Sequence, residues 1–262
     1  MARIAYVDGA FCPLADASVH IEDRGYQFAD GVYEVVLVVD GKLWDAEGHF
    51  QRWQRSLSEL SITSPISDNA FPLIIKRLLK LNRLKSALVY MQATRGVAPR
   101  NHPFPNEVVP TLTMTARRFS LEASNKMASK GASVVTTEDI RWKRVDIKTI
   151  SLLPNVLAKE AARSQGADEA WLVGPDGVTE GSSTNAWIVT KDGVLVTHPT
   201  GTSILGGITR KTVMQCAHDL QLKVEERVFT VNEALAAKEA FFTSATGLIM
   251  PVVRINGVEI GG

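Results

Sequence analysis

Residues 138–149 read Glu138-Asp139-Ile140-Arg141-Trp142-Lys143-Arg144-Val145-Asp146-Ile147-Lys148-Thr149. The run is partly β-branched and dense in charge, and the hydroxyl residues Thr149 and Ser151 follow its last lysine. As a strand it would place Arg144, Asp146 and Lys148 on one face, because side chains alternate between the two faces. We hypothesise that Lys148 is a Schiff-base lysine. Most lysines are solvated surface charges, so support for this role must come from the rest of the chain.

The composition is that of an ordinary globular protein. Of the 262 residues, 45% are apolar and 22% are charged, which is enough for one large domain or two smaller ones. The net charge of +1 provides no basic field for nucleic acid.

The cysteines, the histidines and the N-terminus argue against a metal-binding, secreted or membrane protein. Cys12 and Cys216 lie far apart without metal-like neighbours, and the five histidines show no ligand spacing, so no metal site is expected. The N-terminus lacks an apolar signal core, and no run approaches the roughly 18 apolar residues of a membrane helix. We therefore expect a soluble, cytoplasmic protein with no membrane or nucleic-acid partner.

The first forty residues predict two hairpins. Residues 3–7 alternate between apolar and polar, and Asp8-Gly9 supplies the turn into a second short strand. Residues 32–39 form a β-branched run that Asp40-Gly41 closes before residues 42–44. Both segments are expected to contribute to one antiparallel sheet.

Two helices and two strands are expected next. Asp45 is a candidate N-cap for the first helix, and Ser67-Asp68 is expected to open the second. Their apolar residues fall at helical spacing: Phe50, Trp53, Leu57 and Leu60, then Phe71, Ile74, Ile75, Leu78 and Leu81. Strands at 87–95 and 109–116 follow, and the polar residues 117–125 are the best linker candidate.

The second half mixes short strands with helices. Asn155 is a candidate N-cap for a helix that ends at Gly166, and Gly206-Gly207 leads into another helix. Thr230 and Glu233 form a capping box for a short helix. The apolar residues of the helix after Gly207 are Val213, Met214, Ala217 and Leu220. The predicted strands cover residues 169–173, 186–190, 194–197, 240–243 and 251–255.

Many hairpins without regular βαβ alternation predict an α+β architecture with two lobes. We expect a small N-terminal domain over residues 1–117 and a larger domain over residues 118–262. Asn256-Gly257 is a strong hairpin signal, and the chain stops at Gly261-Gly262 as that hairpin begins to return. This ending leaves room for a C-terminal tail beyond the sequence.

A candidate phosphate cradle lies at Thr202-Ser203-Ile204-Leu205-Gly206-Gly207-Ile208-Thr209-Arg210. Paired glycines let the backbone approach a ligand, and the following helix offers free N–H groups and a positive dipole end. An ordinary loop-to-helix start is the alternative. The glycine–lysine spacing of a Walker loop is missing.

Two further segments concentrate polar groups. Val178-Thr179-Glu180-Gly181-Ser182-Ser183-Thr184-Asn185 combines a carboxylate, three hydroxyls and an amide, although a solvated turn could also do so. A glutamate beside a pyridine nitrogen keeps that nitrogen protonated, which makes the ring an electron sink. Phe242-Thr243-Ser244-Ala245-Thr246-Gly247 is a second hydroxyl-rich turn that could bind phosphate or carboxylate oxygens.

The loop Arg95-Gly96-Val97-Ala98-Pro99-Arg100-Asn101-His102-Pro103 is stiffened by proline. Arg100 and His102 lie two residues apart, so in an extended segment they point the same way and can clamp a carboxylate. Basic loops are usually solvated, but the prolines favour a positioned site. Lysine, glutamate, phosphate cradle and carboxylate clamp together indicate a pyridoxal-phosphate enzyme that acts on an amino acid.

Five motifs in order give the chain a family likeness: 22–35 (Glu22-Asp23-Arg24-Gly25 through Val35), 94–102 (Thr94-Arg95-Gly96 and Pro99-Arg100-Asn101-His102), 139–148, 179–183 and 205–210. The chain resembles the fold-type IV pyridoxal-phosphate transaminases, and within them the D-amino-acid transaminases. The likeness covers nearly the whole chain. It implies a two-domain α+β fold with pyridoxal 5'-phosphate in the interdomain cleft.

The resemblance also implies roles for individual residues. Lys148 would carry the cofactor as a Schiff base, Glu180 would pair with the pyridine nitrogen, and Arg141 would face the 3-hydroxyl. The phosphate would be held by Arg52, Ile208, Thr209 and Ser244. Relatives carry another hydroxyl where Ala245 stands, which puts one phosphate or substrate contact in doubt. Residues 247–250 are a candidate wall of the side-chain pocket.

The substrate carboxylate would be bound by Tyr33, Arg100 and His102. In similar enzymes the last two come from the partner subunit, which implies a homodimer. This arrangement favours D-amino acids with 2-oxo acid acceptors, in a two-stage amino transfer. The alternatives on the same scaffold are a branched-chain L-transaminase, an (R)-amine transaminase and an aminodeoxychorismate lyase. A binding protein that has lost turnover is a further alternative, which intact Lys148 and Glu180 disfavour.

Overall fold

A computed structural model describes residues 3–67 and 69–261 of the chain. The fold divides into two compact units: Met1–Leu121 with Ile147–Ser151, and Glu122–Asp146 with Leu152–Gly262. Both units combine helices with a sheet, which confirms the α+β class. The domain limits 1–117 and 118–262 stay predictions.

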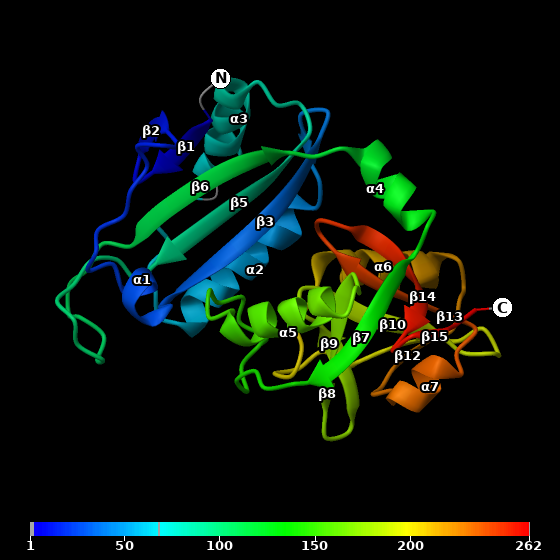
Figure 1. Cartoon of the computed structure of the whole chain (residues 1–262). Coiled ribbons are helices and arrows are strands. Elements are labelled where there is room, and N and C mark those ends of the chain that lie inside the picture. The colour runs from blue at the N-terminus through cyan, green and yellow to red at the C-terminus, as the bar shows by residue number, and fades with distance from the viewer. Residues whose placement is uncertain (1–2, 68, 262) are drawn as a thin grey trace. The chain divides into compact units, whose positions relative to one another are not determined.

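The first unit is an antiparallel sheet with strand order β2-β1-β6-β5-β3-β4 and two main helices (Figure 1). Its elements are, in chain order, β1 (Ile4–Val7), β2 (Ala10–Pro13), α1 (Arg24–Phe28), β3 (Gly31–Val39), β4 (Lys42–Leu43), α2 (Ala46–Glu59), α3 (Ala70–Asn82), β5 (Ala87–Thr94) and β6 (Thr111–Arg118). Both predicted hairpins are confirmed. At the predicted start of α3, the backbone carbonyl of Ser67 accepts from the N–H of Ala70 at 3.0 Å, and Asp68 lies outside the described residues.

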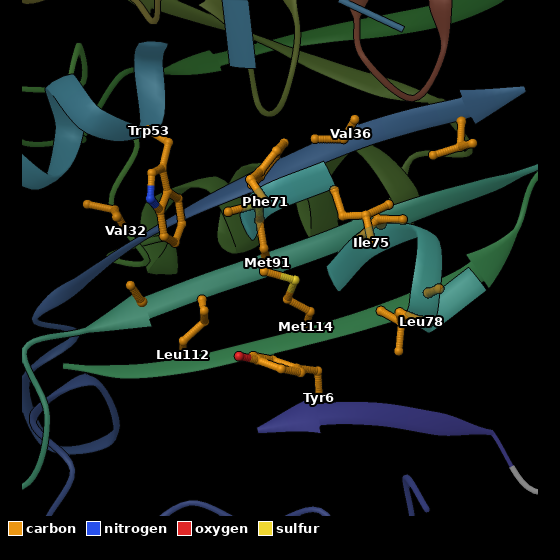
Figure 2. Packing of buried hydrophobic residues seen from close by; sticks show 14 of the residues in the cluster. Tyr6, Val32, Val36, Trp53, Phe71, Ile75, Leu78, Met91, Leu112 and Met114 are labelled. Carbon is orange, nitrogen blue, oxygen red and sulfur yellow. The ribbon is translucent and has the colours of Figure 1, made fainter. Parts of the chain in front are cut away.

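The core of this unit lies between the sheet and the helices α2 and α3 (Figure 2). Trp53 and Leu57, one helical turn apart on α2, are fully buried, as are Ile75 and Leu78 on α3. Burying one such side chain stabilises the fold by about 1.5–3 kcal/mol. The predicted apolar faces of both helices are therefore confirmed. Because the apolar face of α2 packs in the core, the orientation of its polar residues is also fixed.

The capping role predicted for Asp45 is wrong. Asp45 precedes α2, but its φ of 51° is left-handed and its side chain makes no capping bond. An N-cap residue needs an extended backbone for its carboxylate to reach the first N–H groups of the helix.

The strand predicted for residues 138–149 is also wrong. Strand β7 (Ala132–Glu138) ends where the run begins, and the following residues form a loop that passes from the second unit into the first. Arg144 donates to Asp146 at 3.0 Å, so these two charges pair locally. Only Thr149 makes a bridge, to Val32, among the described residues of the run after Glu138. An extended run becomes a strand only when a neighbour accepts its backbone hydrogen bonds.

The second unit has a mixed sheet with strand order β12-β11-β10-β13-β14-β7-β8-β9, and β15 pairs with β14. Strand β7 is parallel to both β14 and β8. The elements after β7 are α5 (Leu153–Ser164), β8 (Glu169–Gly174), β9 (Gly177–Gly181), β10 (Asn185–Val189), β11 (Leu195–Thr197), α6 (Ile208–Asp219), β12 (Val224–Glu226), α7 (Val231–Leu235), β13 (Glu239–Ser244), β14 (Leu248–Ile255) and β15 (Val258–Glu259).

Some of the caps and turns predicted in this unit are confirmed and one is wrong. The capping box of Thr230 and Glu233 is confirmed, and Asn256 and Gly257 both have positive φ in the β14–β15 hairpin. Asn155 is not an N-cap, because α5 begins at Leu153 and the amide of Asn155 donates to the carbonyl of Ser182 at 2.8 Å. Proline in the first turn of α5 starts the helix earlier than the asparagine suggested.

Two more expectations need correction. The predicted linker 117–125 does contain the point where the chain passes from the first unit to the second, between Leu121 and Glu122, but helix α4 (Leu121–Ala128) begins there. None of the side chains of α4 is buried. An exposed helix of this kind has the same polar composition as a loop, so composition alone did not predict it. Leu220 follows α6 and is 70% exposed, while Val213 and Ala217 form the buried face of that helix.

Candidate active site

Lys148 lies against strand β3 in the first unit. Its carbonyl accepts from the N–H of Tyr33 at 3.0 Å, and its own N–H donates to Ser56 Oγ at 3.3 Å. Its Nζ lies 4.2 Å from the centre of the Tyr33 ring. A cation at this distance from an aromatic face is attracted by the ring. The sheet and α2 thus hold the candidate catalytic amine at a defined place.

A buried charged group lies beside this segment. Arg52 donates to both carboxylate oxygens of Glu34, at 2.7 and 2.9 Å, and His49 Nδ1 lies 2.8 Å from Glu34 Oε2. Burial raises the pKa of Glu34, but the charge of Arg52, its hydrogen bonds and that of His49, and the charge of Lys148 lower it to about 2. Glu34 is therefore ionised and fixes the Arg52 guanidinium. The phosphate contact of Arg52 stays a prediction.

Glu34 and His49 were not among the predicted site residues. The sequence carries a signal for Glu34, which is a carboxylate inside the β-branched run 32–39, and the structure leaves it only 1% exposed. Such a buried charge needs a partner. The partners come from α2, and no spacing rule links a strand to the helix that follows it.

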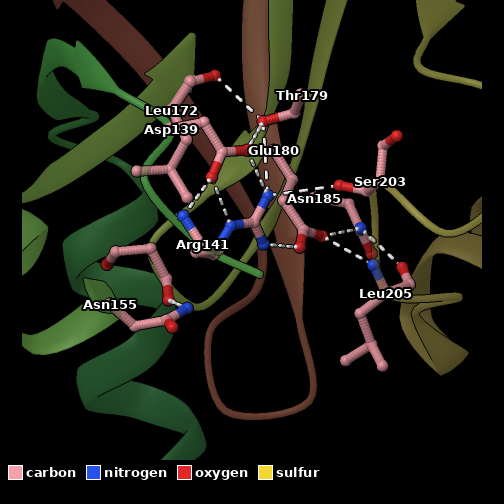
Figure 3. Close-up of polar contacts among 10 residues, drawn as sticks. Asp139, Arg141, Asn155, Leu172, Thr179, Glu180, Asn185, Ser203 and Leu205 are labelled. Carbon is pink, nitrogen blue, oxygen red and sulfur yellow. Dashed lines mark hydrogen bonds and ion pairs between the residues drawn. The ribbon is translucent and has the colours of Figure 1, made fainter. Parts of the chain in front are cut away.

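In the second unit, Arg141 is the centre of a polar cluster (Figure 3). Its Nε donates to Asp139 Oδ1 at 2.8 Å, one Nη donates to Asp139 Oδ2 at 2.7 Å, and the other pairs with Glu180. It also donates to Thr179 Oγ1 and to the carbonyl of Ser203, at 3.3 and 3.2 Å. Burial raises the pKa of Asp139, but the hydrogen bonds and charge of Arg141 outweigh it and hold that pKa below its usual range. Arg141 is thus fixed as a cation.

Glu180 is the second carboxylate of this cluster, beside Asp139, and is 5% exposed. Its second oxygen accepts from Asn185 Nδ2 at 2.9 Å and from the N–H of Leu205 at 3.1 Å (Figure 3). These donors come from β10 and from the loop before α6. Two N–H donors on one carboxylate oxygen stabilise the ionised form of a carboxylate.

Helix α6 begins directly after this loop. Gly207 precedes the helix, no side chain caps it, and its first turn carries no acidic residue. A Cβ at Gly207 would lie 2.0 Å from Asn185 Oδ1, so only glycine fits beside the amide that holds Glu180. Ile208 and Thr209 then form the first turn. The uncapped N–H groups and the helix dipole suit an anion.

Ser244 ends strand β13 in the same unit. Its Oγ accepts from the N–H of Gly247 at 2.9 Å and lies 3.4 Å from Thr246 Oγ1. The turn is therefore closed by Ser244 itself, with Ala245 contributing no hydroxyl. A phosphate contact by Ser244 stays a prediction.

The candidate carboxylate ligands fall into two groups in the first unit. Tyr33 stacks on Tyr90 with ring centres 5.6 Å apart, and burial, together with the charge of Tyr33, raises the pKa of Tyr90 to about 12. Arg100 and His102 are exposed and share another neighbour, the ring of Phe28, at 4.5 and 5.4 Å. The structure thus brings Arg100 and His102 together, and Tyr33 together with Lys148.

Among residues 3–67 and 69–261, no group of three or more His, Cys, Asp or Glu side chains could hold a metal ion. Within the same residues, no helix has the length and apolar character that crossing a membrane requires.

The chain is similar in sequence to proteins of one known family. A family model described as amino-transferase class IV matches residues 31–255. A D-alanine aminotransferase of Staphylococcus epidermidis is 41% identical over 255 residues, which cover 97% of this chain and 90% of that protein. The chain therefore belongs to the class IV amino-transferase family.

Solved structures share the fold. A branched-chain amino acid aminotransferase of Escherichia coli has a TM-score of 0.90 at 22% identity, over 100% of this chain and 89% of that one. A branched-chain aminotransferase of the archaeon Thermoproteus uzoniensis, solved with norvaline, has a TM-score of 0.88 at 26% identity, over 99% and 89% of the two chains. The recognition of the fold from sequence motifs is confirmed.

Proposed function

We propose that this chain is a pyridoxal-phosphate-dependent transaminase that transfers an amino group from a D-amino acid to a 2-oxo acid. The observation that carries the proposal is the 41% identity with a D-alanine aminotransferase over 97% of the chain. The branched-chain aminotransferases named above share the fold at only 22% and 26% identity. They give no reason to prefer a branched-chain L-substrate.

The residues present fit the cofactor. A pyridine nitrogen needs a fixed anion, which Glu180 provides, and a phosphate needs a helix start without acid or side-chain cap, which α6 provides. A Cβ at Gly207 would displace Asn185 from this arrangement. Pyridoxal 5'-phosphate, when bound, withdraws electrons from the substrate Cα and so makes its proton acidic.

We assign the cofactor-binding residues as follows. Glu180 keeps the ring nitrogen protonated, and Arg141, already paired with Glu180 and Asp139, faces the 3-hydroxyl. Arg52, Ile208, Thr209 and Ser244 hold the phosphate. Lys148 would hold the cofactor through Nζ, and the same amine would move the Cα proton of the substrate.

Substrate orientation is assigned to Tyr33, Arg100 and His102. Guanidinium and imidazolium groups bind a carboxylate with charge-assisted hydrogen bonds, and a phenol adds a donor. A carboxylate held in one place decides which face of Cα meets Lys148, and this selects the D-amino acid by geometry. We propose that Arg100 and His102 act in the site of the partner subunit of a homodimer.

The test follows the visible absorption of the bound cofactor while single amino acids are added. D-Alanine or D-glutamate should change the band of the wild-type enzyme within the mixing time, and their L-enantiomers should not. Lys148→Ala should lose turnover with every amino acid. If only an L-amino acid changes the wild-type band, the assignment to D-amino acids is wrong.

A further inference from the structure

The loop that carries Arg100 and His102 is held from inside the protein by a single buried guanidinium. Arg24 Nη1 donates to the carbonyl of Asn101 at 2.5 Å, and Nη2 donates to the carbonyl of His102 at 3.1 Å. Arg24 is 3% exposed, whereas residues 100–102 are exposed. A buried side chain therefore fixes the backbone of an exposed segment, on the side away from solvent.

Arg24 is itself held rigidly. It begins helix α1, and its N–H donates to the carbonyl of Gly96 at 2.9 Å. Its Nε donates to Asp30 Oδ2 at 2.8 Å. Asp23, which precedes it, caps α1 through the N–H of Gly25 and accepts from Thr94 Oγ1, both at 2.8 Å. The start of α1 is thus tied to the end of strand β5 through Thr94 and Gly96, and the guanidinium is tied to Asp30 in the turn before β3.

Asp30 connects Arg24 to a second buried arginine. Arg95 donates to both Asp30 oxygens, at 2.8 and 3.0 Å, and to the carbonyls of Leu60 and Ser61, at 2.8 and 3.2 Å. Its guanidinium carbon lies 3.6 Å from the ring centre of Phe104, beyond the segment 100–102. The two arginines share one carboxylate, but the carbonyls of Asn101 and His102 accept from Arg24.

Phe28, the last residue of α1, completes the arrangement. Its ring centre lies 4.8 Å from the Arg24 guanidinium carbon and 4.5 Å from that of Arg100. The His102 ring lies 5.4 Å away. The backbone of the loop is therefore fixed by Arg24, and both of its functional side chains rest on the same aromatic ring.

We propose that Arg24 is the positioning residue of the carboxylate clamp: it sets the distance and direction between Arg100 and His102 without touching substrate. This inference rests on the proposed function, in which these two residues bind the α-carboxylate. The planar fork of arginine is required, because it donates in three fixed directions to Asp30, Asn101 and His102. A lysine can keep the ion pair with Asp30 but cannot reach both carbonyls at once.

The test compares Arg24→Lys with Arg95→Lys in the cofactor-loaded enzyme. Both variants disturb the same buried ion cluster, so both should lower the melting temperature. Arg24→Lys should raise KM for D-alanine and KM for 2-oxoglutarate by a similar factor, about tenfold or more, because the clamp binds the α-carboxylate that both substrates carry. Its kcat at saturation should stay within about threefold of wild type, since Lys148 is untouched. Arg95→Lys should change neither KM more than about twofold, because the other acceptors of Arg95 are the carbonyls of Leu60 and Ser61 and not those of Asn101 and His102.

A second measurement does not depend on activity. Tryptic cleavage after Arg100, in the exposed loop, should become faster in Arg24→Lys than in wild type, and faster than in Arg95→Lys. If the wild-type enzyme did not transaminate D-amino acids, the proposed function would fail while the cleavage rates would still decide whether Arg24 holds the loop. An unchanged cleavage rate in Arg24→Lys together with unchanged KM values would overturn the inference. If Arg24→Lys does not fold, Phe28→Leu must raise both KM values, and its failure to do so would overturn the inference equally.

Discussion

Lys148 and Tyr33 are joined twice, once through the backbone and once through their side chains. The N–H of Tyr33 donates to the Lys148 carbonyl at 3.0 Å, and Lys148 Nζ lies 4.2 Å from the Tyr33 ring centre. The proposed proton carrier and one proposed carboxylate ligand are therefore parts of one rigid piece of the first unit. A change in the position of either residue must affect the other.

Tyr33→Phe separates the two roles of this side chain. The ring and its contact with Lys148 remain, and only the hydroxyl is lost. Losing one hydrogen bond to a charged group costs about 1.5–3 kcal/mol, which corresponds to roughly a 10–100-fold rise in KM for D-alanine. The cofactor spectrum should not change. Steady-state kinetics decide the matter, and an unaltered KM would remove Tyr33 from the carboxylate site.

Glu34 predicts a specific dependence of stability on pH. Its pKa is lowered from 4.5 to about 2 in the fold, so its contribution is complete above pH 4.5 and disappears as the pH falls towards 2. At about 1.4 kcal/mol per pKa unit, this contribution is on the order of 3 kcal/mol at neutral pH. Glu34→Gln should therefore be much less stable than wild type at pH 7, and the difference should shrink below pH 4.5.

The matched control for Glu34 is an exposed carboxylate. Glu160 also has a lowered pKa, through a hydrogen bond from Arg163, but it is 56% exposed. Solvent screens such a pair, so Glu160→Gln should melt like wild type. Denaturant unfolding at pH 7 and pH 3 measures both variants. If Glu34→Gln lost the same free energy of unfolding at pH 7 and at pH 3, the Glu34 carboxylate would not be the source of the pH-dependent stability.

Glu180→Gln tests the fixed anion. Glutamine has the same shape but no charge, and one of its N–H groups would face the donors of Arg141, Asn185 and Leu205. We expect kcat to fall by about 100-fold or more, on the scale of removing one preorganised electrostatic contact from an active site. Glu180→Asp should retain more activity. Rapid-quench measurement of one half-reaction reports the effect, and a loss of less than threefold would contradict the assignment.

Gly207→Ala tests the helix start. The new Cβ would lie 2.0 Å from Asn185 Oδ1, and Asn185 must then move away from Glu180. Cofactor affinity should fall about tenfold, the effect of losing roughly one hydrogen bond to a charged group. Gly201→Ala is the control, because a Cβ there meets nothing within 4 Å and Gly201 is not among the proposed cofactor residues. If Gly207→Ala and Gly201→Ala bound the cofactor equally well, the start of α6 would have no role in cofactor binding.

The sequence predicted what local rules govern. The spacing of Trp53 and Leu57 predicted a buried helix face, and the preference of Asn256-Gly257 for positive φ predicted a hairpin. Contacts between segments that are distant in the sequence could not be predicted. Arg24 bonds to His102, which lies 78 residues away, and no periodicity connects them. The charged run after Glu138 is not a strand: Arg144 pairs with Asp146 inside the loop, and Arg141 pairs with the distant Glu180, which a strand pattern cannot reveal.

Arg100 should matter for substrate and little for cofactor. Arg100→Ala removes the permanent cation of the clamp and should raise KM for D-alanine about 100-fold, near the upper end of the cost of a charge-assisted hydrogen bond. Cofactor affinity should change less than about twofold, because none of the proposed phosphate ligands is touched. Arg117→Ala, an exposed arginine at the end of β6, is the control. Equal losses of substrate and cofactor affinity would end the clamp assignment.

Mixing subunits decides whose site Arg100 serves. A mixed dimer of Lys148→Ala and Arg100→Ala subunits contains one site with both residues intact, provided that the clamp crosses to the partner. In a symmetric homodimer with random exchange, about half of the dimers are mixed and each regains one of two sites, so about a quarter of the wild-type activity should return. If Arg100 serves the Lys148 of its own chain, every site in the mixture lacks one of the two residues. Activity would then stay at the level of the separate variants, and the proposal that the clamp is shared between subunits would fail.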